Sequence, residues 1–348
     1  KNFFVCSGFN SIGLVSAGGA GRATAEWMIN GGISEDIFCL DISRFEKFHS
    51  ETKFITERVT EALGDLYAMH WPYKQNTTSR NQKLLPYHNK LKEAGACFGV
   101  GGGFERPMWY ARKNQKAEYQ YSFGYQNWYE SAEFETTHAR KYVALFELTP
   151  FSKFEMKGTN AHEALQYLCA NNIKDTEGNT TYTQMLNSNG GIEADLTVTC
   201  IEKNFFRVVS GAAVRSHDKK HILNNLKYDV EFSDITENFA CLGLFGPKSR
   251  DLLTDLAGDK FNTEQFPFGS GKFLTVEGIS IWFQRLSYVG ELGWEVYIPI
   301  HNSKKIYDTI IEIGKTYQLI HAGAHAMDIM RMEKMYLHWG HDISPEEN

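Results

Sequence analysis

The sequence predicts a chain of two compact units with mixed α+β structure, and three observations support this. The 348 residues are enough for two or three hydrophobic cores. Residues 95–107 (Gly-Ala-Cys-Phe-Gly-Val-Gly-Gly-Gly-Phe-Glu-Arg-Pro) are rich in glycine and end in proline, which is typical of a boundary. After Lys141, helix and strand patterns are interspersed. We therefore expect one unit over 1–103 and a second over 104–348.

Composition narrows the classes of partner. Hydrophobic residues make up 42% of the chain and charged residues 22%, as in ordinary globular proteins. The formal net charge of −6 gives no reason to expect a nucleic-acid partner. No apolar run approaches the length of a membrane span, so we expect no membrane partner. The six cysteines form no C-x-x-C pair, which argues against a disulfide framework or a zinc site and suits a reducing compartment.

Both ends of the sequence suggest a piece of a longer protein. The first residue is Lys1, and the apolar run Phe3–Cys6 reads as a strand already under way. The last residues show neither a helix cap nor a polar tail. We expect the chain to be an internal fragment.

The glycine cluster Gly18-Gly19-Ala20-Gly21 is the main feature of the first unit. We expect it to be a loop between the strand at Phe3–Cys6 and a helix from Arg22 that stops at Gly31. Glycines there let backbone N–H groups face a phosphate or the pyrimidine edge of a flavin. The cluster is not a G-x-G-x-x-G fingerprint, so a tight packing turn is the alternative. A second helix is expected between residues 44 and 66.

The second unit is expected to combine strands with amphipathic helices. The expected strands cover residues 143–146, 151–156, 196–200, 205–209 and 241–245. The expected helices begin at Asn160, which resembles a capping box with Glu163, after Gly246-Pro247, near Lys304 and near His325.

An acidic strand follows the turn Asn189-Gly190-Gly191. Asp195 opens an otherwise apolar strand, so its carboxylate is either a solvated strand end or a placed functional group. Glu193 lies two residues earlier and therefore on the same face, where it could assist or replace Asp195.

Two further groups of charged residues follow. Glu291 and Glu295 flank glycines after Tyr288, and the pattern fits either a charged turn or a carboxylate that accepts from an amidine-like pair of N–H groups. Asp328 and Arg331 lie three residues apart on a helix, as in a surface ion pair. The histidines fit no standard metal site, so no metal is expected.

The string from Ser7 to Gly31 resembles the last strand, loop and helix of the FAD domain in dimethylglycine and sarcosine dehydrogenases. Phe104-Glu-Arg-Pro-Met-Trp109 matches the signature with which these enzymes enter their second domain. The resemblance implies that the first unit is the C-terminal remnant of an FAD-binding α/β domain. It also implies that the backbone of residues 18–21 lies against the flavin ring.

The strings Tyr182–Val198 and Tyr288–Tyr297 resemble the folate-site signatures of glycine-cleavage aminomethyltransferases. The resemblance implies a tetrahydrofolate-binding domain that lacks its C-terminal barrel. In such a site the key acid faces N5 and N10 of the folate, and the other positions contact the pterin. Carried over, these are Asp195 as the catalytic acid and Tyr182, Tyr288, Glu295 and Arg331 as folate contacts. Members often have two adjacent acids, whereas Ala194 precedes Asp195 here.

The resemblance implies a reaction that joins the two units. A small N-methylated amine gives a hydride to FAD, and tetrahydrofolate captures the resulting one-carbon unit as 5,10-methylene-tetrahydrofolate. The alternatives are a stand-alone folate-dependent transferase and a folate-binding module without turnover. The expected location is the bacterial cytoplasm or the mitochondrial matrix. The identity of the amine, covalent attachment of FAD and oligomeric state are left open.

Overall fold

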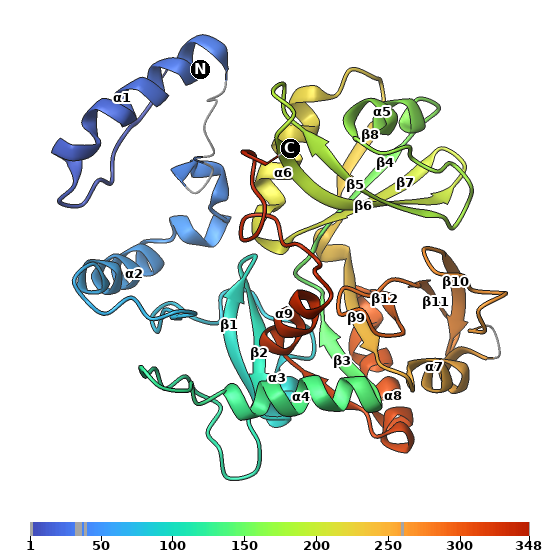
Figure 1. Ribbon diagram of the computed structural model, residues 1–348. Coiled ribbons are helices and arrows are strands. Elements are labelled where there is room, and N and C mark those ends of the chain that lie inside the picture. Colours follow the sequence, from blue (N-terminus) through green and yellow to red (C-terminus); the bar gives the residue numbers. More distant parts are fainter. Residues whose placement is uncertain (1–2, 32–36, 38–39, 259–260, 348) are drawn as a thin grey trace. The chain divides into compact units, whose positions relative to one another are not determined.

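The computed structural model describes residues 3–31, 37, 40–258 and 261–347 (Figure 1). The chain divides into two compact units, Lys1–Ser79 and Arg80–Asn348. Among the described residues, no helix is both long and apolar enough to cross a bilayer.

The first unit is helical. It contains α1 (Gly13–Asn30), α2 (Thr52–Asp65) and 3-10 turns at Ile42–Arg44 and Lys47–Ser50. The expected stop at Gly31 is confirmed, because this residue caps α1 in the left-handed conformation with φ 75°. Helix α1 has no buried residue, and α2 buries only Phe54.

Two expectations for this unit are wrong. Residues 3–6 form no strand, because a strand needs a neighbour to pair with and the described part of the unit contains none. The cluster Gly18, Gly19, Ala20 and Gly21 is not a loop but lies inside α1. The helix begins at Gly13 and continues through the cluster, where alanines support it despite the glycines.

The second unit begins with α3 (His88–Glu93) and the hairpin β1 (Ala96–Gly101) and β2 (Phe104–Tyr110). The glycine-rich segment is therefore not a linker but this hairpin. A Cβ atom on Gly102 would lie 2.7 Å from the Ala212 carbonyl oxygen, so the turn requires glycine. The boundary expected between 103 and 104 falls within this turn, whereas the compact units divide after Ser79.

A six-stranded sheet forms one half of the second unit (Figure 1). Its order is β10-β11-β12-β9-β3-β13, and all its pairs are antiparallel except β13 with β3. The strands are β3 (Ala144–Glu147), β9 (Phe239–Phe245), β10 (Gly271–Val276), β11 (Ile279–Gln284), β12 (Gly293–Pro299) and β13 (Ile320–Ala322). The helices in contact with it are α4 (Tyr129–Lys141), α7 (Ser249–Ala257), α8 (Ser303–Gly314) and α9 (Ala324–Glu333).

An antiparallel five-stranded sheet in the order β5-β6-β7-β4-β8 forms the other half. Its strands are β4 (Ser152–Lys157), β5 (Thr180–Leu186), β6 (Ile192–Glu202), β7 (Phe205–Ser210) and β8 (Glu231–Asp234). Helices α5 (Ala161–Leu168) and α6 (Arg215–Asn225) pack on it, as Figure 1 shows. Short 3-10 turns lie at Ala212–Val214, Thr236–Asn238, Ile300–Asn302 and Lys315–Tyr317.

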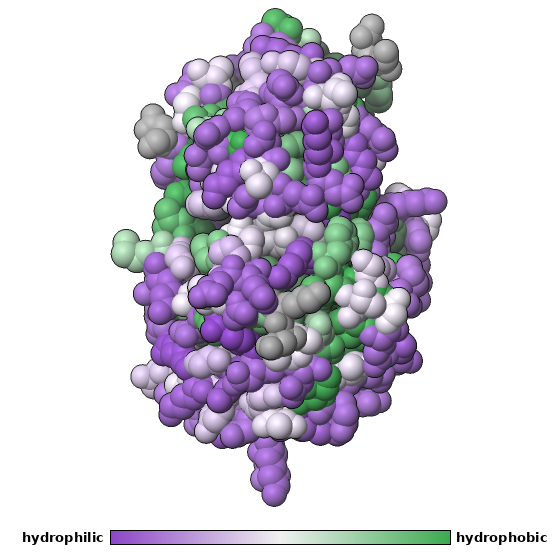
Figure 2. All heavy atoms as spheres, turned by 90° about the vertical axis from the view of Figure 1, so that its right-hand side faces the viewer, coloured by the Kyte–Doolittle hydropathy of each residue, from purple (hydrophilic) through white to green (hydrophobic). Residues whose placement is uncertain are grey.

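Each sheet has its own apolar core. Alternate residues of β6, namely Ala194, Leu196 and Val198, pack with Phe154 in the core of the five-stranded sheet. A larger cluster that includes Trp294 and Phe283 fills one side of the six-stranded sheet. On the face shown in Figure 2, hydrophilic side chains predominate and hydrophobic ones form scattered groups. Because side chains alternate along a strand, Glu193, Asp195 and Thr197 lie on the opposite face of β6.

The two sheets are joined by a buried glutamine. Gln284 ends β11 in one sheet, and its amide donates to the hydroxyls of Thr180 and Thr199 on β5 and β6 of the other, at 3.1 Å for Thr199. Its carbonyl oxygen accepts from the Trp282 indole at 2.7 Å. Gly178, at φ +81°, brings the backbones to within hydrogen-bond distance, since its Cβ would lie 2.5 Å from the Gly271 oxygen.

The α+β class is confirmed, and so are most expected elements of the second unit. The strands near 143–146, 151–156, 196–200, 205–209 and 241–245 are β3, β4, β6, β7 and β9. The helices expected near 304 and 325 are α8 and α9. The capping box at Asn160 is not formed, since its side chain makes no cap hydrogen bond.

We predict that Gln284→Ala destabilises the second unit by about 2–4 kcal/mol, because three buried polar partners lose their hydrogen bonds. Urea unfolding of the chain measures this. Gln265→Ala, at an exposed site, is the control and should change the unfolding free energy by less than about 0.5 kcal/mol. Equal losses of unfolding free energy in the two variants would contradict the role of Gln284 in joining the two sheets.

Candidate functional site

Asp195 lies on the polar face of β6, directly opposite Gln184 of β5. The Gln184 amide donates to its Oδ1 at 2.8 Å, and the Tyr182 hydroxyl is a second donor. Burial raises the pKa of Asp195, and these two hydrogen bonds oppose the rise. Tyr182, on the edge strand β5, is 54% exposed, so the acid lies beside an exposed ring.

Tyr288 approaches the same acid from the six-stranded half. It lies in the turn before β12, and its pKa is raised to about 12, chiefly by burial and in part by the charge of Asp195. Its hydroxyl donates to the Leu337 carbonyl oxygen at 3.2 Å, and its ring lies 6.4 Å from that of Tyr336. The structure thus brings Tyr182 and Asp195 of the β5–β6 hairpin together with Tyr288 from a segment distant in sequence.

Arg331 is next to Tyr288 but is already occupied. The expected ion pair with Asp328 is formed, but Arg331 is only 4% exposed, so the pair is not a surface one. Its Nε donates to Asp328 at 2.8 Å, and its Nη1 donates to the Tyr336 carbonyl at 3.1 Å and to Asp342. Arg331 therefore fastens residues 336–342 to α9.

Glu295 belongs to a second set of contacts on β12. Its Oε2 accepts from the Tyr297 hydroxyl at 2.6 Å. Burial raises the pKa of Glu295, while the Tyr297 hydroxyl and the Lys153 ammonium oppose the rise. Glu295 is paired in register with Gln284, the residue that joins the two sheets.

Lys153 was not singled out from the sequence. It is fully buried on β4, and its ammonium donates to the carbonyl oxygens of Thr149 and Phe151 at 2.8 Å and of Thr236 at 3.3 Å. Burial lowers the pKa of Lys153 to about 8. The sequence of the strand Ser152–Lys157 gives no sign that carbonyl oxygens would surround this ammonium.

Glu193 and Asp195 are on the same face of β6, as expected, but their partners differ. Glu193 Oε2 lies 3.2 Å from His217 Nε2 on α6. The other ring nitrogen, Nδ1, lies 3.0 Å from Asp218 Oδ1. His217 was not singled out from the sequence. The only feature of the nearby sequence that indicates its role is the next residue, Asp218.

The helical glycine cluster does not fit the expected flavin contact. In an α-helix only the first four N–H groups lack an intrahelical acceptor, and residues 18–21 come after the first turn of α1. Their N–H groups therefore belong to the helix. The flavin contact through Gly18, Gly19, Ala20 and Gly21 has no support from this conformation.

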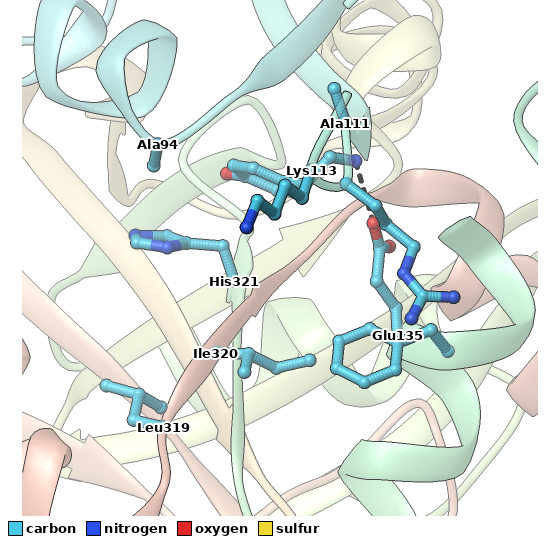
Figure 3. A pocket seen from close by; sticks show the side chains of 10 residues that line it. Ala94, Ala111, Lys113, Glu135, Leu319, Ile320 and His321 are labelled. Atoms are coloured by element: carbon cyan, nitrogen blue, oxygen red, sulfur yellow. Dashed lines mark hydrogen bonds between the residues drawn. The ribbon is translucent and has the colours of Figure 1, made fainter. Parts of the chain in front are cut away.

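A separate cavity of about 420 Å³ lies beside α4 and β13 and shares no residue with the sites above (Figure 3). In Figure 3 the Lys113 side chain extends across it in the direction of His321. Glu135 is buried there and accepts the N–H groups of Tyr110 at 2.7 Å and Gly323 at 2.8 Å. Burial raises the pKa of Glu135 to about 8. These contacts fasten β2 and the start of α9 to α4.

Within the ranges that the structure describes, no group of three or more His, Cys, Asp or Glu side chains is arranged to hold a metal ion.

Comparison with family models matches two parts of the chain. Residues 87–348 match the GCVT N-terminal domain, and residues 30–84 match the FAD dependent oxidoreductase central domain. A crystal structure of the glycine cleavage system aminomethyltransferase T from Bartonella henselae has a TM-score of 0.63 at 22% identity. It covers 76% of this chain and 66% of that one. This likeness supports the fold of the second unit.

Two relatives align over nearly the whole chain. The 4-methylaminobutanoate oxidase (formaldehyde-forming) of Paenarthrobacter nicotinovorans is 37% identical over 99% of this chain. The mitochondrial sarcosine dehydrogenase of Mus musculus is 30% identical over 100% of it. The chain spans 42% of the length of each of these relatives.

We predict that His217 makes stability depend on pH. Burial lowers the pKa of His217, but hydrogen bonds with Asp218 and Glu193 outweigh it and raise the pKa to about 9 from 6.5. The stabilisation is therefore fully present below about pH 6.5 and is lost as the pH rises through about 9. Urea unfolding should show a loss of about 1–3 kcal/mol across this window in the wild type. An equal loss in His217→Gln would contradict the assignment.

Proposed function

The chain belongs to the family of the GCVT N-terminal domain, and on that premise we propose that its second unit binds tetrahydrofolate and transfers a one-carbon unit to it. The resemblance to sarcosine and dimethylglycine dehydrogenases inferred from the sequence is confirmed by the relatives and by both family models. The observation that carries the proposal is the meeting of Tyr182, Asp195 and Tyr288 at one edge of the five-stranded sheet.

Asp195 is proposed as the acid that moves a proton at N5 or N10 of the folate. It is held by two neutral donors, the Tyr182 hydroxyl and the Gln184 amide, so its charge is not cancelled by a bound cation. Burial raises its pKa, which makes it a better proton acceptor than a solvated aspartate. The exposed ring of Tyr182 and the ring of Tyr288 supply flat surfaces beside it for the pterin or the benzoyl group.

Glu295 is proposed to bind the aminopyrimidine edge of the pterin. One of its oxygens accepts from Tyr297, and the other is available for an N–H of the ligand. A carboxylate accepts two parallel N–H groups well, and a partly buried one does so strongly. Arg331 is proposed to act through the residues it holds, because Tyr336 and Leu337 contact Tyr288.

We infer that the complete protein oxidises a small N-methylated amine, as the names of its relatives indicate for those proteins. FAD would accept the hydride, and the match of residues 30–84 to the FAD dependent oxidoreductase central domain supports this part of the proposal. The iminium carbon is attacked by N5 of tetrahydrofolate, and N10 then closes on the same carbon. The amine leaves with the C–N electron pair and gains the protons lost by N5 and N10, one of them through Asp195.

The relatives compared come from a bacterium and from mitochondria. We propose a bacterial cytoplasm or a mitochondrial matrix as the corresponding location of this protein.

We predict that Glu295→Gln weakens tetrahydrofolate binding about 10- to 100-fold, because an amide replaces the charged acceptor. Calorimetric titration of the chain with tetrahydrofolate measures the dissociation constant. Glu202→Gln, at an exposed end of β6, is the control and should leave it unchanged. Unchanged affinity in Glu295→Gln would remove this residue from the site.

We predict that Asp195→Asn lowers the rate of 5,10-methylene-tetrahydrofolate formation about 10²- to 10⁴-fold while changing the affinity for tetrahydrofolate less than ten-fold. Formaldehyde with dimethylamine supplies the iminium, and the rate is measured above the uncatalysed background. Wild-type binding without any transfer would favour a non-catalytic folate module. Transfer retained in Asp195→Asn would exclude this residue as the acid.

A further inference from the structure

Three carboxyl groups crowd the end of β6 next to α6. Glu193 and Asp195 project from the same face of the strand, about 7 Å apart along it. Asp218 faces them from α6, and its charge raises the pKa of Asp195. Such neighbours compete for protons, so the sequence alone leaves open which of them is the reacting acid.

His217 is bonded to two of these three groups. Its Nε2 lies 3.2 Å from Glu193 and its Nδ1 lies 3.0 Å from Asp218. The hydrogen bond with His217 lowers the pKa of Glu193, whereas burial raises the pKa of Asp218 and its hydrogen bond with His217 opposes that rise. An ionised carboxylate can only accept a hydrogen bond, so with both carboxyl groups ionised both ring nitrogens donate. A histidine with two donor nitrogens is an imidazolium, and the arrangement therefore places a positive charge between Glu193 and Asp218.

An aromatic cap shields this charge. The Trp339 ring lies 5.1 Å from the His217 ring at an interplanar angle of 31°. The Trp339 indole donates to the Ile192 carbonyl at 2.7 Å, one residue before Glu193. The Ile192 N–H in turn donates to the Glu347 carbonyl at 2.9 Å. The His217 side chain is 14% exposed. An ion pair screened from water in this way is stronger than one at the surface.

We propose that His217 is a positioning residue which engages Glu193 and Asp218 as an imidazolium and so leaves Asp195 as the single acid available to the folate. This rests on the proposed function only in taking Asp195 as the reacting group. The hydrogen-bond partners of Glu193 and Asp195 indicate which of the two is the reacting acid. Glu193 has a cation and the Asn187 amide, whereas Asp195 has only the neutral donors Tyr182 and Gln184.

The remaining titratable groups around the cluster do not replace His217. His221 lies one turn further along α6, and burial lowers its pKa, which disfavours a charge there. Tyr182 on β5 and Tyr288 in the turn before β12 face Asp195, and burial raises the pKa of both. They therefore stay neutral donors near neutral pH. Arg331, beyond Tyr288, is bonded to Asp328 and Asp342.

The test measures the pKa of Asp195 in the folded chain by carboxylate ¹³C NMR, without any ligand. In His217→Gln the unpaired Glu193 and Asp218 charges should raise this pKa by about one pH unit or more. Adding Glu193→Gln to that variant should reverse about half of the rise. The matched control is His162→Gln, because His162 lies on α5 and bonds the Ile173 carbonyl, and it should produce no shift.

A merely structural role for His217 would lower stability and leave the Asp195 pKa in place, and that result would overturn the proposal. If His217→Gln does not fold, Glu193→Gln alone decides the question, because removing one negative charge should lower the pKa of Asp195. No change in that variant also overturns it. These readouts need no folate, so a wild type that fails to transfer a one-carbon unit would count against the proposed function and not against this one.

The acid limb of the pH–rate profile of one-carbon transfer should follow the pKa of Asp195. His217→Gln should move it to higher pH by the amount measured for Asp195. A limb that stays in place while the Asp195 pKa moves would show that another group is the reacting acid.

Discussion

The amide of Gln284 is the interaction on which the arrangement of the site depends. It is paired in register with Glu295 in one sheet and is bonded to Thr199 of β6 in the other, the strand that carries Asp195. The Gln284 amide therefore connects the strand next to Glu295 with the strand that carries Asp195, the two carboxylates proposed to hold opposite parts of the folate. Because its donors and acceptor are all satisfied inside the core, small displacements of one sheet are opposed by loss of these hydrogen bonds.

The charged groups around the site fall into two classes. Asp328 and Asp342 share the guanidinium of Arg331, while Glu193 and Asp218 share the imidazolium of His217. The two carboxylates proposed to meet the folate are instead held by tyrosine hydroxyls, Asp195 by Tyr182 and Glu295 by Tyr297. A neutral donor orients a carboxylate without cancelling its charge, so these two retain the capacity to interact with an incoming ligand.

The sequence was informative where structure depends on neighbours along the chain. Alternation along β6 placed Asp195 and Glu193 on one face, and the turn at Asn189 correctly joined β5 to β6. It failed where partners come from elsewhere. The roles of His217 and Lys153 depend on groups from other elements. For Arg331, the sequence anticipated the contact with Asp328 but not those with Tyr336 and Asp342. The glycines of α1 misled because a loop and a helix can share that composition.

The carbonyl nest around Lys153 resembles the coordination shell of a bound alkali ion, with the ion attached to the chain. A free ion in such a shell exchanges with the medium, and its occupancy follows the salt present. A tethered ammonium does not exchange. The position of the ammonium that acts on Glu295 is therefore set when the chain folds and does not depend on which cations surround the protein.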